Sequence, residues 1–151
     1  MKRLFCCLFI LVCVFVFGCG GVKLVGLVSV RGTVTYNGQP LEGAIVGFSP
    51  KNFKSGDRVA SGTTNSQGKF ELRTIGELGA LPNDYLVTVS KKIIDKENQP
   101  TPNNTNQPPP SQRQIKFKSL IPARYDNVKT SGLNFVVGKE GLTDVKIELS
   151  D

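Results

Sequence analysis

One cysteine in this sequence stands where its sulfur could be covalently modified. Cys19 follows Val16, Phe17 and Gly18 and precedes Gly20, so small residues lie directly before and after it. Cleavage after Gly18 would make Cys19 the first residue of the mature chain, with a sulfur that can carry two acyl chains. Two buried acyl chains hold a protein stably on a bilayer.

The segment before Cys19 has the composition of a secretory signal. Lys2 and Arg3 supply positive charge, residues 4–17 are apolar, and Gly18 is the small residue before the cut. We therefore predict a lipoprotein signal peptide over residues 1–18 and an exported protein, lipid-anchored to the cell membrane or the outer membrane, with its domain facing the periplasm or the exterior. The alternative is an uncleaved transmembrane helix, since the apolar stretch approaches the roughly 20 residues that a span requires.

The composition argues against catalysis by the mature chain. There is no histidine, and the four cysteines, at positions 6, 7, 13 and 19, all fall within or directly after the signal segment. Ser-His and Cys-His nucleophile pairs and zinc sites built on His or Cys are therefore excluded. The acidic residues are scattered, so no carboxylate pair stands out. We expect no enzyme, no cofactor and no metal.

The charge distribution does not predict nucleic-acid binding. The chain carries a formal net charge of +7 at pH 7, but its basic residues are spread along the sequence. Single-stranded nucleic-acid binders interleave such residues with aromatic side chains that stack on bases, and this sequence shows no such pattern. We interpret the excess charge as a solvated surface.

Period-two alternation of apolar and polar residues runs through most of the remaining chain, which predicts an all-β domain. Asn37-Gly38 and residues 65–68 have the composition of tight turns between strands. Seven short segments separated by such signals predict an antiparallel two-sheet sandwich. The residues expected to face its core are Val28, Val30, Val34, Tyr36, Ala44, Val46, Phe48, Phe70, Leu72, Tyr85, Val87, Val89, Leu133, Phe135, Val137, Val145, Ile147 and Leu149.

The predicted organisation has three parts. Residues 1–18 form the signal peptide, 19–26 a tether and 27–151 the β domain. A Pro/Asn-rich loop interrupts the domain at about 93–116. Its central part, residues 98–112, contains five prolines and no charged residue. Such a segment cannot bury enough apolar surface to offset the entropy of ordering, so we expect the loop to be disordered.

Several motifs together resemble the carboxypeptidase regulatory-like domain. They are GTVTYNGQPLEGA at residues 32–44, SGTTNSQGKF at 61–70 and YLVTV at 85–89. The endings IPARY at 121–125 and TSGL at 130–133 are similar to those of small planctomycete lipoproteins of this type. The resemblance implies a transthyretin-like (prealbumin-like) seven-stranded sandwich without catalytic residues. It also implies that the Tyr85 hydroxyl caps a loop while its ring fills the core.

Two functions follow from these observations. The leading one is a membrane-anchored interaction or structural module that binds an envelope protein through loops or sheet edges. The alternative is a carbohydrate-binding module for envelope or extracellular polysaccharide, for which Tyr125, Phe53 and Phe117 are the candidate aromatic platforms. The chain has no Trp and three Tyr, which favours the interaction module. The partner and the oligomeric state are left open.

Overall fold

The computed structural model describes residues 24–95 and 116–151, and these residues form an all-β structure. Twelve strands and one 3₁₀ turn, η2, make up this part of the chain. The predicted seven-strand count is therefore not reproduced directly. The elements in chain order are β1 (Val30–Tyr36), β2 (Gln39–Pro40), β3 (Ile45–Pro50), β4 (Ala60–Thr63), β5 (Lys69–Glu71), β6 (Arg73–Thr74), β7 (Glu77–Leu78), β8 (Asn83–Ser90), β9 (Lys92–Ile94), β10 (Phe117–Ser119), η2 (Ala123–Asp126), β11 (Leu133–Val137) and β12 (Leu142–Leu149).

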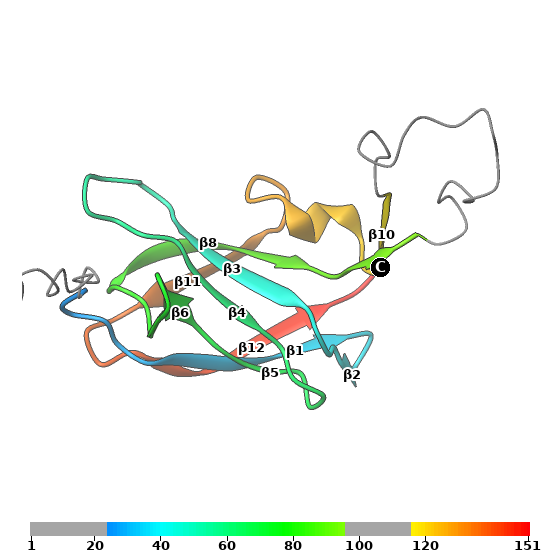
Figure 1. Ribbon diagram of the computed structural model, residues 1–151, viewed down its shortest axis with the longest axis horizontal. Helices are drawn as coiled ribbons and strands as arrows, with labels where there is room; N and C mark the ends of the chain where they lie inside the picture. Colours follow the sequence, from blue (N-terminus) through cyan, green and yellow to red (C-terminus); the bar gives the residue numbers. More distant parts are fainter. Residues whose placement is uncertain (1–23, 96–115) are drawn as a thin grey trace, which may run out of the picture.

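Two larger sheets form two layers (Figure 1). One sheet has six strands in the order β11-β8-β3-β4-β6-β7, and the other joins β12, β1 and β2, with β5 also paired to β1. Strands β9 and β10 pair only with each other and form a separate two-stranded sheet. Each face that alternation predicted to be apolar is turned toward the opposite layer.

The prediction that all strands run antiparallel is wrong for one pair. Strands β1 and β12 are parallel, with Val34 opposite Ile147 and Tyr36 opposite Leu149. These are the first and last strands of the described domain, and the whole chain between them acts as the crossover. No hairpin therefore imposes an antiparallel direction on them, whereas strands joined by short turns are antiparallel.

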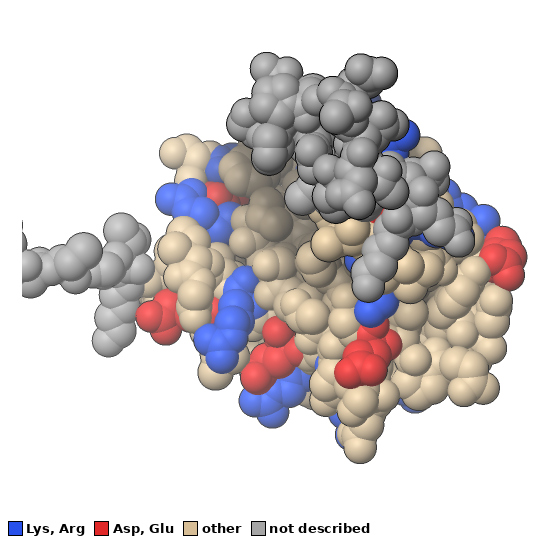
Figure 2. All heavy atoms as spheres, turned by 45° about the vertical axis from the view of Figure 1, so that its right-hand side comes forward, with Lys and Arg blue, Asp and Glu red and all other residues tan. Residues whose placement is uncertain are grey.

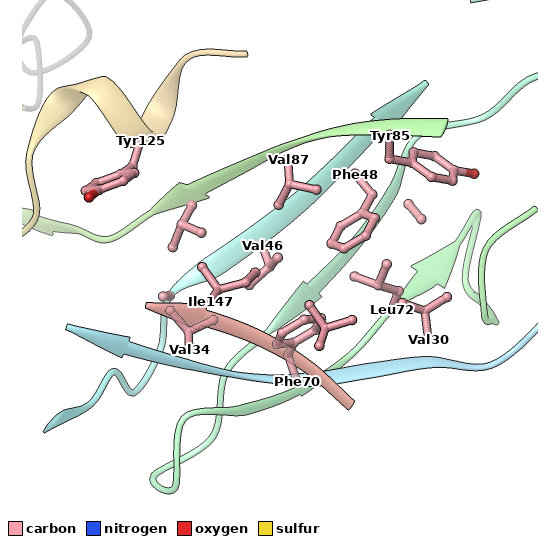
Figure 3. Packing of buried hydrophobic residues seen from close by; sticks show 14 of the residues in the cluster. Val30, Val34, Val46, Phe48, Phe70, Leu72, Tyr85, Val87, Tyr125 and Ile147 are labelled. Carbon is pink, nitrogen blue, oxygen red and sulfur yellow. The ribbon is translucent and has the colours of Figure 1, made fainter. Parts of the chain in front are cut away.

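The core lies between the two layers (Figure 3). Phe48 of β3 is at its centre, with ring centroids 5.6 Å from Tyr85, 6.0 Å from Phe135 and 6.5 Å from Phe70. Phe70 belongs to the sheet opposite Phe48, so this aromatic cluster joins the layers. Most predicted core positions are buried; Val28, Tyr36, Leu133 and Phe135 are partly buried and pack against the cluster.

The predicted turns form as expected. Asn37 and Gly38 both take positive φ, 50° and 78°, which is the geometry of a two-residue hairpin turn. In the second turn the Asn65 side-chain oxygen accepts hydrogen bonds from the backbone N–H groups of Gln67 and Lys69, each at 3.0 Å. These turns set the register that places the alternating residues toward the core.

The strand register defines two ends of the domain. Val30 pairs with Leu142, Pro50 with Tyr85 and Asn83 with Val137, so the segments adjoining these residues gather at one end. We call this the proximal end, because the described chain begins there; it comprises residues 24–29, 51–59, 72–82 and 138–141. The opposite ribbon end comprises residues 37–44, 91–95, 116–132 and 150–151. Figure 1 shows β10 and the C-terminus at the ribbon end, on the right.

Candidate functional site

The residues predicted to carry the lipid anchor lie outside the described part of the chain. Cys19 and the cleavage region Val16, Phe17 and Gly18 all precede residue 24. Within residues 24–95 and 116–151, no helix is long and apolar enough to span a membrane. The anchor therefore stays a prediction.

The structure corrects the prediction that Tyr125 is an exposed aromatic platform. Its side chain lies in η2 and is 7% exposed. The hydroxyl donates to the Ser150 carbonyl oxygen and accepts from the Ser150 N–H, both at 3.2 Å. The Arg124 guanidinium lies over the ring, 4.7 Å from its centroid. A 3₁₀ turn, which strand periodicity does not reveal, rotates this ring inward to pack beneath the arginine.

The other two candidate aromatics are exposed, but the fold does not bring them together. Phe53 lies in the β3–β4 connection at the proximal end and is 63% exposed. Phe117 lies in β10 at the ribbon end and is 61% exposed. Strands β8 and β3 separate the two ends (Figure 1). A single aromatic platform made of the three predicted residues does not exist.

The β9–β10 ribbon is the most unusual surface of the described domain. Phe117 is paired with Ile94, and Lys118 with Ile93. Directly paired residues share one face of a ribbon and successive residues alternate, so Ile93 and Ile94 point to opposite faces. Both are solvent-exposed, at 44% and 50%, as is Leu120 at 41%. The face with Ile94 and Phe117 is apolar, and on the other face Ile93 lies opposite Lys118. Neighbouring exposed apolar side chains rimmed by charged ones are typical of a surface that binds a partner.

The base of the ribbon is attached to the domain. The Lys92 ammonium lies 2.5 Å from a carboxylate oxygen of Asp126 in η2. The Leu120 N–H donates to the Lys91 carbonyl oxygen at 2.9 Å, and the Lys91 ammonium donates to the Glu42 carbonyl oxygen at 2.6 Å. The ribbon continues from β8 through Lys91. These contacts hold it in a defined direction although an isolated two-stranded sheet is marginally stable.

A polar cluster closes the ribbon end. The Tyr36 hydroxyl donates to one carboxylate oxygen of Asp151 at 2.5 Å, and the Asn37 side-chain amide donates to the other at 3.0 Å. The hydrogen bond from Tyr36, then that from Asn37, lowers the pKa of Asp151, and the same bond raises the pKa of Tyr36. The hydrogen bond from the backbone of Ser150 lowers the pKa of Tyr125. Tyr36 and Asn37 thus attach Asp151 to the end of β1, and Tyr125 attaches Ser150 to η2.

Tyr85 has the role that the resemblance implied. Its side chain is 1% exposed, and its hydroxyl donates to the Leu81 carbonyl oxygen at 2.8 Å. Burial raises the pKa of this hydroxyl above its usual value. The ring fills the core at the proximal end while the hydroxyl holds the turn before β8.

An open groove of about 790 Å³ crosses the outer surface around β4. Ile45, Val59 and Ile75 supply its apolar lining, and Arg73 and Glu71 lie at its polar side. Glu71 is already paired with Arg31 at 2.6 Å. The groove contains no aromatic ring, so it lacks the flat surface on which a sugar would stack.

Charges of one sign do not gather on the face of the domain seen in Figure 2. Figure 2 shows basic and acidic side chains interspersed on the visible face. Among the described residues, no group of three or more His, Cys, Asp or Glu could hold a metal ion.

Sequence reasoning missed the ribbon. The loop was expected to begin at residue 93, but Ile93 and Ile94 belong to β9; residues 96–115 lie outside the described part of the chain. The alternation Lys116-Phe117-Lys118-Ser119-Leu120 carried a strand signal that could have been read. Its pairing with β9 could not, because the sequence between the two strands carries no signal of a short hairpin turn.

Comparison with protein-family models, curated proteins and solved structures found no match to this chain.

Proposed function

We propose that this chain is a non-catalytic lipoprotein of the cell envelope whose β domain presents the β9–β10 ribbon to an envelope protein. Acyl chains on Cys19 would hold it on the membrane. The observation that carries the proposal is the exposure of Ile93, Ile94 and Phe117 on two faces of a ribbon that pairs with neither larger sheet. Burying these side chains against a partner would be favourable, and sheet edges in general offer backbone groups for strand addition.

The finer fold proposal is a seven-stranded, transthyretin-like sandwich of the carboxypeptidase regulatory-like type. In support, the predicted segments correspond to β1, β3, β4, the continuous β5–β6 segment, β8, β11 and β12. The additional strands β2, β7, β9 and β10 are two or three residues long. Under this proposal they are local additions to the seven-stranded framework.

Carbohydrate binding is the alternative, and one observation favours it: Phe53 and Phe117 each expose most of a flat ring. The two rings lie at opposite ends of the domain, however. Tyr125 is buried, so it does not add a second exposed ring to either of them. A protein partner accounts better for the exposed aliphatic side chains of the ribbon, of which Ile94 is paired with Phe117.

In-cell crosslinking of the full chain, followed by mass spectrometry, tests the ribbon. The double variant Ile94→Ser/Phe117→Ser removes the largest apolar pair of the ribbon. The matched control, Ile45→Ser/Val136→Ser, removes side chains that are 56% and 68% exposed on the six-stranded sheet. We expect one recurrent protein partner, lost with the ribbon variant and retained with the control. If both variants still capture the partner, the ribbon is not the binding surface. Capture of glycan fragments would favour the carbohydrate alternative.

Mass spectrometry of the membrane fraction tests the anchor separately. The intact protein should carry acyl chains on Cys19, and Cys19→Ser should accumulate as an unacylated precursor with altered membrane partition. A Cys19→Ser protein that is still cut after Gly18 and released would contradict the lipoprotein proposal.

A further inference from the structure

Exposed apolar side chains gather at the proximal end of the domain as well as on the ribbon. They come from three separate segments: the leading residues, the β3–β4 connection and the β6–β7 hairpin. The residues are Val25 (86% exposed), Phe53 (63%), Ile75 (63%), Leu78 (51%) and Val59 (49%). The strand register brings these segments to one end of the domain, where the described chain begins (Figure 1).

The leading residues are attached to this end rather than hanging from it. Val28 and Ala80 form a bridge through two hydrogen bonds, 2.9 Å from Val28 N–H and 3.0 Å from Ala80 N–H. The Leu142 N–H donates to the Ser29 carbonyl oxygen at 2.9 Å. The direction from which the chain reaches the domain is therefore set by the fold.

The backbone conformation of Ile75 indicates that an exposed apolar side chain has a role at this end of the domain. Thr74 and Glu77 are paired, so Ile75 and Gly76 form a two-residue turn, with φ values of 50° and 85°. Such turns favour Asn-Gly, and positive φ is unfavourable for a β-branched residue. The strained side chain is mostly exposed, so it adds little to the core. Strain of this kind points to a function of the side chain itself.

The charges near these side chains are mixed. Lys51, Lys54 and Arg58 flank Phe53 on the β3–β4 connection, and all three are exposed. Arg73 and Lys139 are also exposed at this end, and the exposed acids there are Glu77, Asp84 and Glu140. The long cationic side chains could reach lipid phosphates while Phe53 enters the acyl boundary. Because basic side chains are in modest excess, anionic lipid would strengthen a contact that is mainly apolar.

The distance from the proposed anchor is short. Five peptide steps separate Cys19 from Leu24, the first described residue, and they span at most about 18 Å when fully extended. An acylated Cys19 would therefore hold the proximal end close to the bilayer. The ribbon end, at the other end of the strands, would face away from it.

We propose that the proximal end docks on the lipid bilayer, with Phe53, Ile75 and neighbouring apolar side chains inserted at the headgroup boundary and the ribbon held outward. This inference rests on the proposed lipid anchor. It adds to the anchor a defined orientation, in which the domain lies against the membrane through one end instead of moving freely on a tether.

The two exposed phenylalanines provide a matched test. The chain contains no Trp, so Phe53→Trp and Phe117→Trp each introduce a single tryptophan that can be excited selectively, at sites that are 63% and 61% exposed. Each full-length acylated protein is reconstituted into phosphatidylcholine vesicles containing lipids brominated on their acyl chains. We expect at least a twofold quenching and a blue shift for Trp at position 53, and neither for Trp at position 117.

A second variant separates insertion from folding. Ile75→Asn places a residue that favours the turn geometry, so the melting temperature should stay the same or rise while the quenching at position 53 decreases. Ile93→Asn at the ribbon end is the control and should leave the quenching unchanged. If Trp at position 53 is quenched equally in the Ile75→Asn and Ile93→Asn backgrounds, Ile75 does not take part in the docking.

Flotation and mass measurement of the same samples distinguish the possible failures. If the acylated protein floats with the vesicles but position 53 is not quenched, the docking is refuted and the anchor stands. If no acyl chain is found on Cys19 and the protein does not float, the anchor fails and the docking fails with it. A concentration-dependent blue shift without quenching by brominated lipid would indicate a second copy of the chain and would also overturn the proposal.

Discussion

The two ends of the domain use similar side chains on different supports. Each end exposes one phenylalanine, Phe53 or Phe117, and each holds a buried tyrosine whose hydroxyl bonds a backbone carbonyl oxygen, Tyr85 to Leu81 or Tyr125 to Ser150. At the proximal end the exposed side chains lie on connections between core strands. At the ribbon end most lie on two short strands outside both larger sheets. The comparison shows that similar exposed side chains can rest on different kinds of support, connections between core strands at one end and a separate ribbon at the other.

The difference predicts how each end responds to perturbation. Backbone hydrogen bonds that lie between core strands open only with the whole domain, whereas those of a separate ribbon can open locally. The proximal end should therefore behave as a fixed surface, and the ribbon end as one that adjusts to what it binds.

Val87→Asp should have the largest effect on stability, because it should unfold both ends of the domain together. Val87 is fully buried in β8, the strand that runs from one end to the other. Burying an unpaired charge there should cost about 4 kcal/mol or more and eliminate the cooperative melting transition. Val136→Asp, on an exposed position of the same sheet, should change stability by only about 0.5 kcal/mol. An unchanged melting midpoint in Val87→Asp would refute the assigned face of β8.

Removing the Tyr85 hydroxyl should lower the free energy of unfolding more than removing the Tyr125 hydroxyl. Tyr85→Phe leaves the Leu81 carbonyl oxygen without this partner and should cost about 1–2 kcal/mol. Tyr125→Phe should cost less, because Arg124 also donates to the Ser150 carbonyl oxygen, at 2.6 Å. Urea titration of both variants measures the difference. A larger loss for Tyr125→Phe would reverse the order of stability that we assign to the two ends.

At alkaline pH, Tyr85 and Tyr125 should affect the stability of the domain differently. Burial raises the pKa of Tyr85 above its usual value of 10.0, so its ionisation favours the unfolded chain. Its contribution is fully present below the unfolded pKa and is lost as the pH rises through the folded pKa. The urea midpoint should therefore fall above about pH 10, and Tyr85→Phe should reduce that fall. Tyr125→Phe should not reduce it, since the pKa of Tyr125 is shifted downward.

Acid should loosen the ribbon end before the proximal end. The hydrogen bond from Tyr36 lowers the pKa of Asp151, so the stabilisation is present above the unfolded value of 3.8 and is lost as the pH falls through the folded pKa. Hydrogen exchange at the Asn37 N–H, which donates to the Leu149 carbonyl oxygen, should then accelerate. The Val28 N–H at the proximal end serves as the control. Asp151→Asn should remove the pH dependence, and persistence of that dependence would contradict the assignment.

The smallest effects should come from the ion pairs. Lys92–Asp126 at the ribbon end and Arg31–Glu71 between β1 and β5, next to the proximal end, are both solvent-exposed, so neither should contribute more than about 0.5 kcal/mol to global stability. Asp126→Asn should nevertheless accelerate exchange of the Leu120 N–H in the ribbon. Glu71→Gln should leave exchange of the Leu72 N–H unchanged, because that amide bonds to Val30 within the core strands. Equal acceleration in both variants would show that the ends have similar local stability.

Much of the fold could be predicted because alternation and turn chemistry are local. Val34, Val46, Phe48 and Val87 are buried as their parity indicated, and Asn37-Gly38 turns the chain with two positive φ values. The burial of Tyr125 could not be predicted in this way. It depends on a 3₁₀ turn and on Ser150, which lies 25 residues further along the chain.

The candidate surfaces were predictable only in part. Phe53 and Phe117 could be identified as exposed aromatics, but not as residues of opposite ends, because the register of six intervening strands decides their separation. The exposure of Ile75 was not predicted either. An isoleucine with positive φ has no sequence signature, since the hairpin register alone places it in that conformation.

The all-β class, the faces of the main strands and the two turn types follow from local sequence, since side-chain alternation and the φ preferences of Asn and Gly act over a few residues. The parallel pairing of β1 with β12, the departure of β9 and β10 from the larger sheets as a ribbon, and the burial of Tyr125 emerge only in the folded domain. These features depend on contacts between segments far apart in the chain, whose geometry is set by packing of the whole core rather than by any local preference.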